Sequence, residues 1–368
     1  MTTVGVATRQ IKPAAVVYCE GNFASVDGKT ANGLIHQSDS YEIVSVIDSS
    51  KDGVDSGVAL FGHANGIPIL RDIDAALHHL DEKPEVFIYG LAPSTGRLSQ
   101  VDRDVVSRAI AHGMHVVCGL HEFLGDDPFF RDAAKKNQVN IYDIRKPKPN
   151  HALRIFDGSI SLVKSKRIAV MGTDCAIGKR TTATILDKAL NSQNVKTILV
   201  ATGQTGLMQG ARYGVVMDAL PSQFCAGELE ACITRASTEV GPDVILVEGQ
   251  GALGHPAFCT SALILRGSQP DGVILQHAPK RRYRCDFPNM RLPDLVDEIR
   301  IIENFIDTKV IGITINHEGM SDEELDDTMA SYKGIFGLPV CDPLRSSQET
   351  LAAMVIDSFS EIKRSLHR

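Results

Sequence analysis

A short segment of the chain combines the residue types of a phosphate-binding loop. Residues 167–182 read RIAVMGTDCAIGKRTT, an apolar run that leads into a glycine turn and then into Gly178-Lys179. Successive backbone amides in such a turn, with the positive end of a helix dipole behind them, bind an oxyanion without any special side chain. We therefore predict a buried strand over 168–171, a turn at Gly172 and a helix that begins at Lys179, whose ammonium group adds a mobile positive charge.

The loop departs from the standard P-loop spacing in ways that bear on its chemistry. Thr173 stands where the pattern has its first glycine, and the residue after Lys179 is Arg180. A nucleoside triphosphatase normally has a Ser or Thr there, whose hydroxyl holds Mg²⁺. The next hydroxyl belongs to Thr181, but one step along a helix rotates a side chain by about 100°. The sequence therefore predicts phosphate binding without ATP hydrolysis and without Mg²⁺ or another metal; the alternative is a glycine turn that only joins strand to helix.

The residues predicted to bind the phosphate-bearing ligand form the loop and the start of its helix. They are Gly172, Thr173, Asp174, Cys175, Ala176, Ile177, Gly178, Lys179, Arg180 and Thr181. Asp174 could orient the substrate or Lys179. Cys175 lies where a helix N-terminus could lower the pKa of its thiol, although a nucleophilic role is the less favoured interpretation.

Polar residues follow the other strands expected in the second half of the chain. Apolar runs predict strands over 197–201, 244–247, 273–276 and 310–315. The side chains that follow them are Gln204, Glu248 with Gln250, His277, and Asn316 with His317. Because the carboxyl ends of strands in a doubly wound sheet share one edge, these side chains should meet the loop there. They would supply a group-transfer site, with Glu248, His277 and Lys179 as the catalytic candidates and Gln204 and Gln250 at the substrate.

Two of these candidates have more than one interpretation. In an ATPase, Glu248 would hold Mg²⁺ through water, whereas in an acyltransferase it could take a proton from an amine nucleophile. It could also simply pair with Lys179 or Arg180. His277 could be a base or a hydrogen-bonded structural residue.

A run of positive charge stands out in an otherwise acidic chain. The sequence KRRYR at residues 280–284 includes Arg281, Arg282 and Arg284, while the net charge of the chain is −7. The run is either a solvated surface loop or a clamp that binds an anionic substrate through these three arginines. The overall negative charge argues against a nucleic-acid partner.

Length and composition indicate a globular protein of two domains. The chain has 368 residues, of which 43% are hydrophobic and 23% charged. No apolar run approaches the ~20 residues of a membrane helix, and the N-terminus lacks a signal-peptide pattern, so we expect a cytoplasmic protein without a membrane partner. The eight cysteines form no C-x-x-C pair, which disfavours zinc and disulfide frameworks. We also expect small-molecule substrates and a homo-oligomer.

The first part of the chain repeats a strand and helix rhythm that predicts a parallel α/β domain. The expected strands are 15–19, 41–48, 68–70, 86–89, 115–118 and 139–142, and the clearest helices are 73–80 and 100–112. Asp48 ends the second strand, where a dinucleotide-binding domain has its ribose-binding acid, but a full GxGxxG is absent. We therefore predict a Rossmann-like shape and leave nucleotide binding open.

The polar, proline-interrupted segment RKPKPN at residues 145–150 predicts the domain boundary. A Rossmann-like N-terminal domain would then occupy 1–150, and a P-loop NTPase-like doubly wound parallel sheet would occupy 151–368. In the second domain we expect helices over 179–191 and 222–237, and helices that open at Ser321 and Ser346, each with a Glu three residues later as a capping box.

Four segments together resemble a bacterial family long described by a domain of unknown function. They read GTDCAIGKRTT, ATGQTG, VMDALPSQFCAGELE and VILVEGQGAL. Characterised members of that family are D-glutamate N-acetyltransferases of the DgcN type, with a Rossmann-like and a P-loop domain. The loop also resembles that of dethiobiotin synthetase, an ATP-dependent enzyme that has Thr where this chain has Arg180.

The resemblance implies transfer of an acetyl group from acetyl-CoA to the amine of D-glutamate or a related D-amino acid. The loop would bind the phosphates of the coenzyme, Glu248 or His277 would act as base, and loop amides with Lys179 would stabilise the oxyanion. The arginines of the basic run would bind the carboxylates of the acceptor. An ATP- and Mg²⁺-dependent ligase and a non-enzymatic nucleotide-binding protein are the alternatives.

Overall fold

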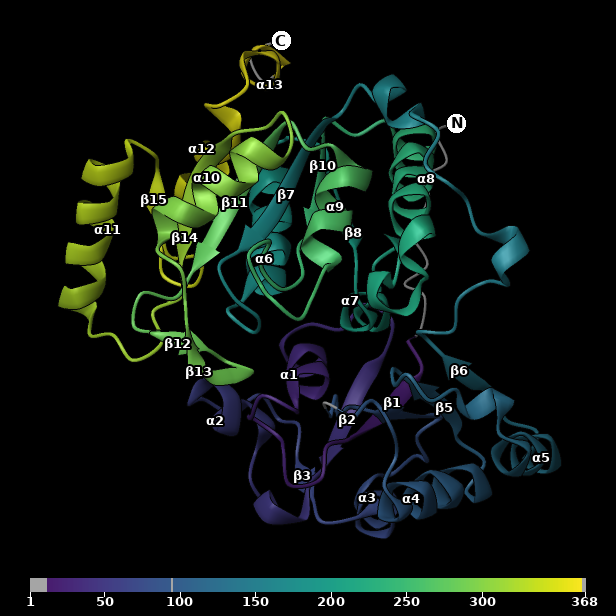
Figure 1. Ribbon diagram of the computed structural model, residues 1–368. Coiled ribbons are helices and arrows are strands. Elements are labelled where there is room, and N and C mark those ends of the chain that lie inside the picture. The colour runs from purple at the N-terminus through teal and green to yellow at the C-terminus, as the bar shows by residue number, and fades with distance from the viewer. Residues whose placement is uncertain (1–11, 94, 366–368) are drawn as a thin grey trace, which may run out of the picture. The chain divides into compact units, whose positions relative to one another are not determined.

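The computed structural model of the chain describes residues 12–93 and 95–365. Residues 1–11, part of the segment in which the sequence shows no signal-peptide pattern, lie outside this range. Two compact units are present, and Figure 1 labels the elements of both. The first extends to Lys146 and includes Leu207–Gly210; the second comprises Pro147–Gly206 and continues from Ala211. The sequence-based division at residue 150 placed Leu207–Gly210 in the second domain, but Met208 is buried in the core of the first unit.

The first unit contains a six-stranded sheet with the order β3-β2-β1-β4-β5-β6. All its neighbouring strands are parallel. Its strands are β1 Ala14–Tyr18, β2 Glu42–Ile47, β3 Ile69–Leu70, β4 Val86–Tyr89, β5 His115–Cys118 and β6 Ile141–Asp143. This is the strand order of a Rossmann-like domain, as the sequence predicted.

Helices cover both faces of this sheet because the buried strands are apolar on both sides. They are α1 Lys29–His36, α2 Ser56–Phe61, α3 Ile73–His79, α4 Gln100–Ala111 and α5 Pro128–Asn137. On β1, Val16 and Tyr18 pack with α3, α4 and α5, whereas Ala15 and Val17 pack with α1. Helices α1, α2 and α5 were not predicted from the sequence.

The second unit contains a seven-stranded sheet with the order β15-β14-β11-β7-β10-β8-β9, also parallel throughout. Its strands are β7 Lys166–Gly172, β8 Thr197–Ala201, β9 Tyr213–Gly214, β10 Val244–Glu248, β11 Gly272–His277, β14 Val310–Ile315 and β15 Val340–Cys341. Strands β12 Tyr283–Arg284 and β13 Phe287–Arg291 form a separate antiparallel hairpin. The central position of β7 places its carboxyl end between the ends of β10 and β11.

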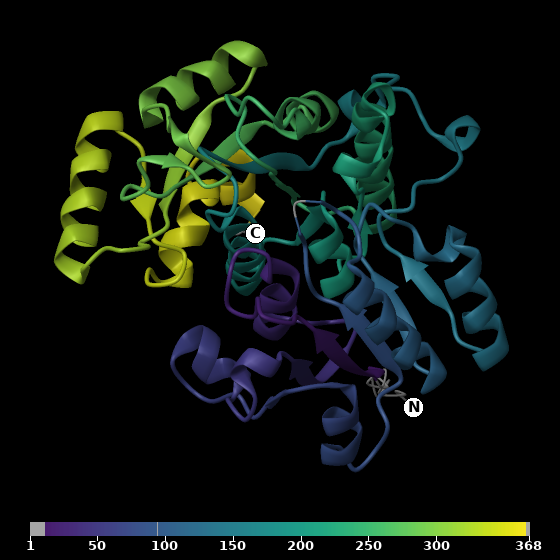
Figure 2. The ribbon, with the colours of Figure 1, turned by 60° about the horizontal axis from the view of Figure 1, so that its bottom comes forward.

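This sheet is also wound on both faces (Figure 1 and Figure 2). Its helices are α6 Lys179–Ser192, α7 Gln204–Gln209, α8 Ser222–Val240, α9 Thr260–Ser268, α10 Leu295–Phe305, α11 Asp322–Phe336, α12 Gln348–Ile356 and α13 Ser360–Ser365. Ala169 and Met171 of β7 pack with α8 to α11, and Ile168 and Val170 pack with α6, α12 and α13. The α/β fold class predicted for the second domain is confirmed.

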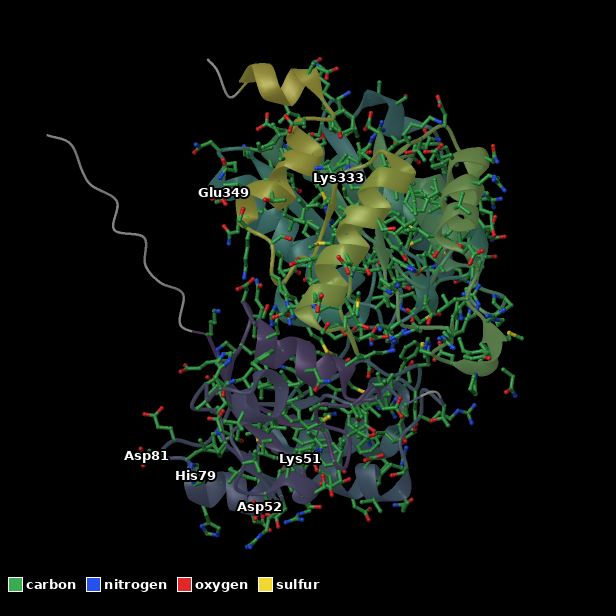
Figure 3. All side chains as sticks on the ribbon, turned by 90° about the vertical axis from the view of Figure 1, so that its left-hand side faces the viewer. Lys51, Asp52, His79, Asp81, Lys333 and Glu349 are labelled. Carbon is green, nitrogen blue, oxygen red and sulfur yellow. The ribbon has the colours of Figure 1, made fainter. Side chains whose placement is uncertain are left out.

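Three local predictions in the second unit were wrong. The segment expected to be a strand-end turn after β8 becomes helix α7 from Gln204 onward. The helix expected to open at Ser346 has Ser347 as its N-cap, and the Ser347 hydroxyl accepts from the Thr350 amide. Glu349, labelled in Figure 3, is an exposed residue in the first turn of that helix and makes no capping box. The last two residues of the basic run, Tyr283 and Arg284, form strand β12 of the β12–β13 hairpin, where a loop was expected.

Within the described residues, none of the helices has the length and apolar character needed to cross a bilayer.

Candidate functional site

The loop between β7 and α6 has the backbone geometry of an anion-binding nest. Gly178 is the N-cap of α6 with φ +97°, and Ala176 has φ +48°. Left-handed residues in such a turn direct successive amides inward. In the described part of the chain no side chain caps α6, so an anion could accept from the amides of its first turn.

Gly172 leaves room for two side chains where the strand enters the loop. A Cβ built on it would lie 2.8 Å from Ile177 Cδ1 and 2.8 Å from Lys179 Cδ. The absence of a side chain at Gly172 therefore allows the stem of Lys179 to pass close to the loop backbone. This is the physical reason for the glycine that the sequence placed at the turn.

The ammonium group of Lys179 is held inside the loop. The residue is 6% exposed, and its Nζ donates to the carbonyl of Asp174 at 2.5 Å. Burial lowers the pKa of Lys179. A bound phosphate would give the ammonium a stronger partner than a neutral carbonyl.

Arg180 and Glu248 form an ion pair at the end of β10. Arg180 Nη1 donates to Glu248 Oε2 at 3.1 Å, and the same oxygen accepts from the Thr202 amide at 3.1 Å. Gly206 lies against this pair, since a Cβ there would be 2.3 Å from Arg180 Nη1. The sequence left several roles open for Glu248, and in the structure its carboxylate pairs with Arg180. A guanidinium thus lies against the carboxylate that would hold Mg²⁺ through water in an ATPase.

His277 ends β11 and supports the loop from the neighbouring strand. Its Nδ1 lies 2.9 Å from Thr173 Oγ1, and the side chain is buried. Burial lowers the pKa of His277 to about 4, so the imidazole is neutral near pH 7.

Gln276 and Asn316 also fix the loop, and the sequence missed the first of them. The Thr182 hydroxyl donates to Gln276 Oε1 at 2.6 Å, and the Thr173 amide donates to the Gln276 carbonyl at 3.1 Å. Asn316 Nδ2 donates to the Ile177 carbonyl at 3.1 Å. The signal for Gln276 was an amide side chain inside an otherwise apolar strand. Its side chain anchors the helix that follows the loop.

Asp174 joins the loop to the basic hairpin. This carboxylate is fully buried, and its Oδ2 accepts from Arg281 Nη1 at 3.0 Å and from the Cys285 amide at 2.9 Å. Arg281 Nη1 also donates to the Cys175 carbonyl at 2.7 Å, and its Nε donates to Glu318 at 2.8 Å. The guanidinium of Arg281 therefore already has protein partners on several sides, which a solvated loop would not provide.

The other two arginines of the run differ from each other. Arg284 is 5% exposed and donates from Nη2 to the Gly254 carbonyl at 2.8 Å, whereas Arg282 is exposed. Only the exposed guanidinium retains the solvent access that a substrate clamp needs.

Several buried polar atoms beside Asp174 have no hydrogen-bond partner in the described residues. They are Asp174 Oδ1, His255 Nε2, Arg284 Nη1 and Glu298 Oε2. Of these, Asp174 Oδ1 and Arg284 Nη1 face each other as an ion pair at 3.8 Å. The sequence analysis did not single out His255 or Glu298. Buried polar groups are normally paired, so this cluster is where a water molecule or a ligand group is expected.

The two predicted glutamines have different positions. Gln250 Nε2 donates to the Thr202 carbonyl at 2.6 Å, which connects it through Thr202 to Glu248. Gln204 is buried at the start of α7. The structure thus brings Gln250 next to the ion pair and puts Gln204 on a helix rather than in a turn.

Asp48 of the first unit is occupied by its own backbone neighbours. Its carboxylate accepts from the amides of Gly21, Phe23 and Ser50, each at 3.0 Å. These bonds lower the pKa of Asp48 against the effect of burial. The Asp48 carboxylate therefore stabilises the turn after β1. In a dinucleotide-binding domain an acid at this position binds the ribose, which was the role that the sequence left open.

Comparison with protein families agrees with this geometry. Residues 154–352 match a P-loop domain described as a domain of unknown function, DUF1611_C. The chain belongs to the DUF1611 family. Residues 49–147 match the Rossmann-like domain of the same family, DUF1611_N. The family resemblance inferred from the loop and the two-domain fold are both confirmed.

Individual relatives cover most of this DUF1611 protein. A protein of Pseudoalteromonas sp, named D-glutamate N-acetyltransferase, is 33% identical over 276 residues, which are 73% of this chain and 80% of the relative. A second protein of that name, from Tritonibacter scottomollicae, is 31% identical over 286 residues, 76% of this chain and 82% of the relative. A crystal structure of a DUF1611 family protein from Anabaena variabilis matches with a TM-score of 0.87 and 28% identity, covering 94% of this chain and all of that one.

Proposed function

We propose that the protein is an N-acetyltransferase that moves the acetyl group of acetyl-CoA to the amine of D-glutamate or a related D-amino acid. The observation that carries this proposal is the likeness to two relatives with that name over more than two thirds of each chain. The phosphate loop gives it a physical basis, because coenzyme A presents a diphosphate to be bound without being cleaved.

In this proposal the loop amides and Lys179 bind the diphosphate of coenzyme A. The Arg180–Glu248 ion pair supports a binding mode without Mg²⁺, since a guanidinium neutralises the acid that would otherwise hold the ion. We assign these loop groups to coenzyme binding.

The reaction requires a neutral amine. Its nitrogen attacks the thioester carbon, a C–N bond forms, and the tetrahedral intermediate then releases the coenzyme as the C–S bond breaks. A base must accept the proton that the amine loses, and Glu248 and His277 are the candidates. Arg282, whose guanidinium is exposed, is our candidate for a contact with an acceptor carboxylate.

Steady-state kinetics of conservative variants distinguish a base from a residue that orders the loop. If Glu248 or His277 takes the proton, Glu248→Gln or His277→Asn lowers kcat and leaves the KM for acetyl-CoA near its original value. If the residue only orders the loop, the KM for acetyl-CoA rises instead. The matched control is Glu239→Gln. The carboxylate of Glu239 accepts a hydrogen bond from the Tyr213 hydroxyl and is distant in sequence from the loop.

The direct test of the proposed function is product formation. Purified protein, acetyl-CoA and D-glutamate are incubated, and N-acetyl-D-glutamate and free coenzyme A are measured by mass spectrometry. We expect both products in equal amounts and neither without an acceptor. Absence of coenzyme release across a panel of D-amino acids would exclude the proposal, and phosphate release from ATP with Mg²⁺ would favour a ligase instead.

A further inference from the structure

Two cysteines lie together beside the phosphate loop. The Sγ atoms of Cys175 and Cys285 and a carboxylate oxygen of Asp286 all lie within 4.8 Å of one another. Cys175 belongs to the loop and is partly exposed, while Cys285 is exposed at the turn of the β12–β13 hairpin. Both residues therefore retain solvent-accessible surface.

The backbone holds this pair in place. The Cys285 amide donates to Asp174 Oδ2 at 2.9 Å, and Arg281 Nη1 donates to both Asp174 Oδ2 and the Cys175 carbonyl. The buried carboxylate and the guanidinium thus fasten the hairpin turn to the loop. The two sulfur atoms are close together because these hydrogen bonds hold the loop and the hairpin turn, and not only because of the conformations of the two cysteine side chains.

The surroundings lower the pKa of the Cys175 thiol. The thiol of Cys285 donates a hydrogen bond to the Cys175 sulfur, and the charge of Lys179 adds to the effect, so the pKa of Cys175 is lowered. The hydrogen bond to Cys175, together with burial, raises the pKa of Cys285. Burial also raises the pKa of Cys19, Cys118, Cys225, Cys232 and Cys341. Reactive cysteines have this combination of partial exposure and nearby positive charge.

A metal ion does not fit the neighbouring group of Asp174, Cys175 and His255 well. Asp174, Cys175 and His255 have ligand-type atoms close together, but His255 Nδ1 accepts from the Ala257 amide at 3.2 Å. The proton of the neutral imidazole is then on Nε2, which makes that atom a donor instead of a ligand. The positive charges of Lys179 and Arg281 also oppose a bound cation.

We propose that Cys175 and Cys285 are a site of reversible disulfide formation by exchange with a small-molecule disulfide. The Cys175 thiolate attacks one sulfur of the reagent, forms a mixed disulfide and releases one thiolate. The Cys285 thiol then loses its proton to solvent and its sulfur attacks the Cys175 sulfur, which forms the Cys175–Cys285 bond and releases the second thiolate. Two protein thiols are oxidised, and one external disulfide is reduced to two thiols.

The cross-link would act on the phosphate loop itself. A covalent bond to the hairpin displaces Cys175 within the nest of amides, so a phosphate-bearing ligand should bind more weakly to the oxidised protein. This consequence rests on the proposed function, since it takes acetyl-CoA as the ligand. We expect the dissociation constant for acetyl-CoA to rise by at least about tenfold and to return after reduction with dithiothreitol.

Peptide mapping tests the disulfide without any assay of activity. The full chain is incubated with oxidised glutathione, digested without reduction and analysed by mass spectrometry. We expect a peptide pair joined through Cys175 and Cys285. In Cys285→Ser the glutathione adduct should remain on Cys175, while Cys259→Ser, which removes an exposed cysteine elsewhere, should cross-link like the unchanged protein.

The outcomes separate this proposal from the proposed function. Glutathione adducts that appear at Cys259 without a 175–285 cross-link would overturn the disulfide site. So would one zinc ion per chain in the purified protein that both Cys175→Ser and Cys285→Ser release. A cross-link in a protein whose reduced form does not bind acetyl-CoA would support the thiol pair and count against the acetyltransferase. An unchanged affinity after cross-linking would refute the effect on the loop.

Discussion

Arg180 gives this loop its distinctive chemistry. In a P-loop that cleaves a nucleoside triphosphate, a hydroxyl at this position holds Mg²⁺, whereas here a guanidinium pairs with Glu248. The ion pair is largely buried, with exposed side-chain fractions of 20% and 8% for the two partners. The positive charge is therefore built into the protein and need not arrive with a metal ion.

Replacing Arg180 tests this idea. The variant Arg180→Thr removes the guanidinium and supplies the missing hydroxyl, which leaves Glu248 buried without its charged partner. We expect weaker binding of acetyl-CoA and a gain in affinity for ATP with Mg²⁺, both measured by calorimetry. The double variant with Glu248→Gln should lose the gain for ATP; if it keeps the gain, Glu248 has no part in metal binding.

Lys179 should contribute directly to ligand affinity. In Lys179→Ala a charge-assisted bond to phosphate is lost, which corresponds to about 2 kcal/mol or roughly thirtyfold in Kd for acetyl-CoA. Lys188→Ala, at an exposed position on the same helix, is the control and should bind normally. Equal affinities of the two variants, with circular dichroism showing intact folds, would remove Lys179 from the binding site.

The element that organises the site is the β7–loop–α6 unit, and its glycine is the sensitive point. Gly172→Ala places a Cβ 2.8 Å from Ile177 Cδ1 and from Lys179 Cδ, so these two side chains must shift within the loop. We expect a loss of about 1 to 3 kcal/mol in the free energy of unfolding, measured by urea denaturation, together with weaker acetyl-CoA binding.

A second glycine offers a matched control. Gly334 lies inside α11, and a Cβ there would meet nothing within 4 Å. Gly334→Ala should therefore stabilise the protein by up to about 1 kcal/mol, because alanine favours a helix. The neighbouring Lys333, labelled in Figure 3, is exposed, so the substitution lies on an open part of the helix. A destabilised Gly334→Ala, or an unaffected Gly172→Ala, would contradict this account of the loop.

The strands could be predicted from the sequence because they are short, apolar and buried on both faces. The predicted ranges 86–89, 115–118, 197–201 and 310–315 coincide with β4, β5, β8 and β14. The hairpin could not be predicted, because apolar and polar residues alternate only weakly in YRCDFPNMR. In addition, Asp174, which binds the hairpin turn, is distant in sequence. The start of helix α12 was predicted one residue too early, because two adjacent serines, Ser346 and Ser347, can both act as N-caps.

The site was predictable to the extent that local sequence determines it. The loop, its glycines and the strand-end residues follow from residue type and order. The contacts of Asp174 with Arg281 and Cys285 join residues 107 and 111 positions apart, so no local pattern contains them. The same holds for Arg180 and Glu248, which are 68 positions apart. Several roles remained open for Glu248 at the level of sequence, and tertiary packing selects the pairing with Arg180.

Because the imidazole of His277 is buried, we expect the folded protein as a whole to lose stability in acid. The pKa of His277 in the folded state is about 4, below the ordinary 6.5, so the unfolded chain takes up a proton more readily. The contribution of His277 to stability is complete above pH 6.5 and is lost as the pH falls toward 4. Between pH 7.5 and pH 5 this loss is about 2 kcal/mol.

Urea denaturation at several pH values measures this effect. His277→Gln should make the free energy of unfolding less dependent on pH in this window, whereas His79→Gln, at an exposed histidine labelled in Figure 3, should leave the dependence unchanged. A His277→Gln protein with the original pH dependence would show that another group is responsible.

We propose that the β7–α6 loop binds coenzyme A through its diphosphate and does not use it as a phosphoryl donor. Calorimetric titration of the purified protein with acetyl-CoA, and separately with ATP and Mg²⁺, tests this most directly, with Lys179→Ala in parallel. We expect saturable binding of acetyl-CoA without added metal, weakened in Lys179→Ala, and no cleavage of ATP. Binding of ATP with Mg²⁺ followed by phosphate release, without detectable binding of acetyl-CoA, would contradict the account.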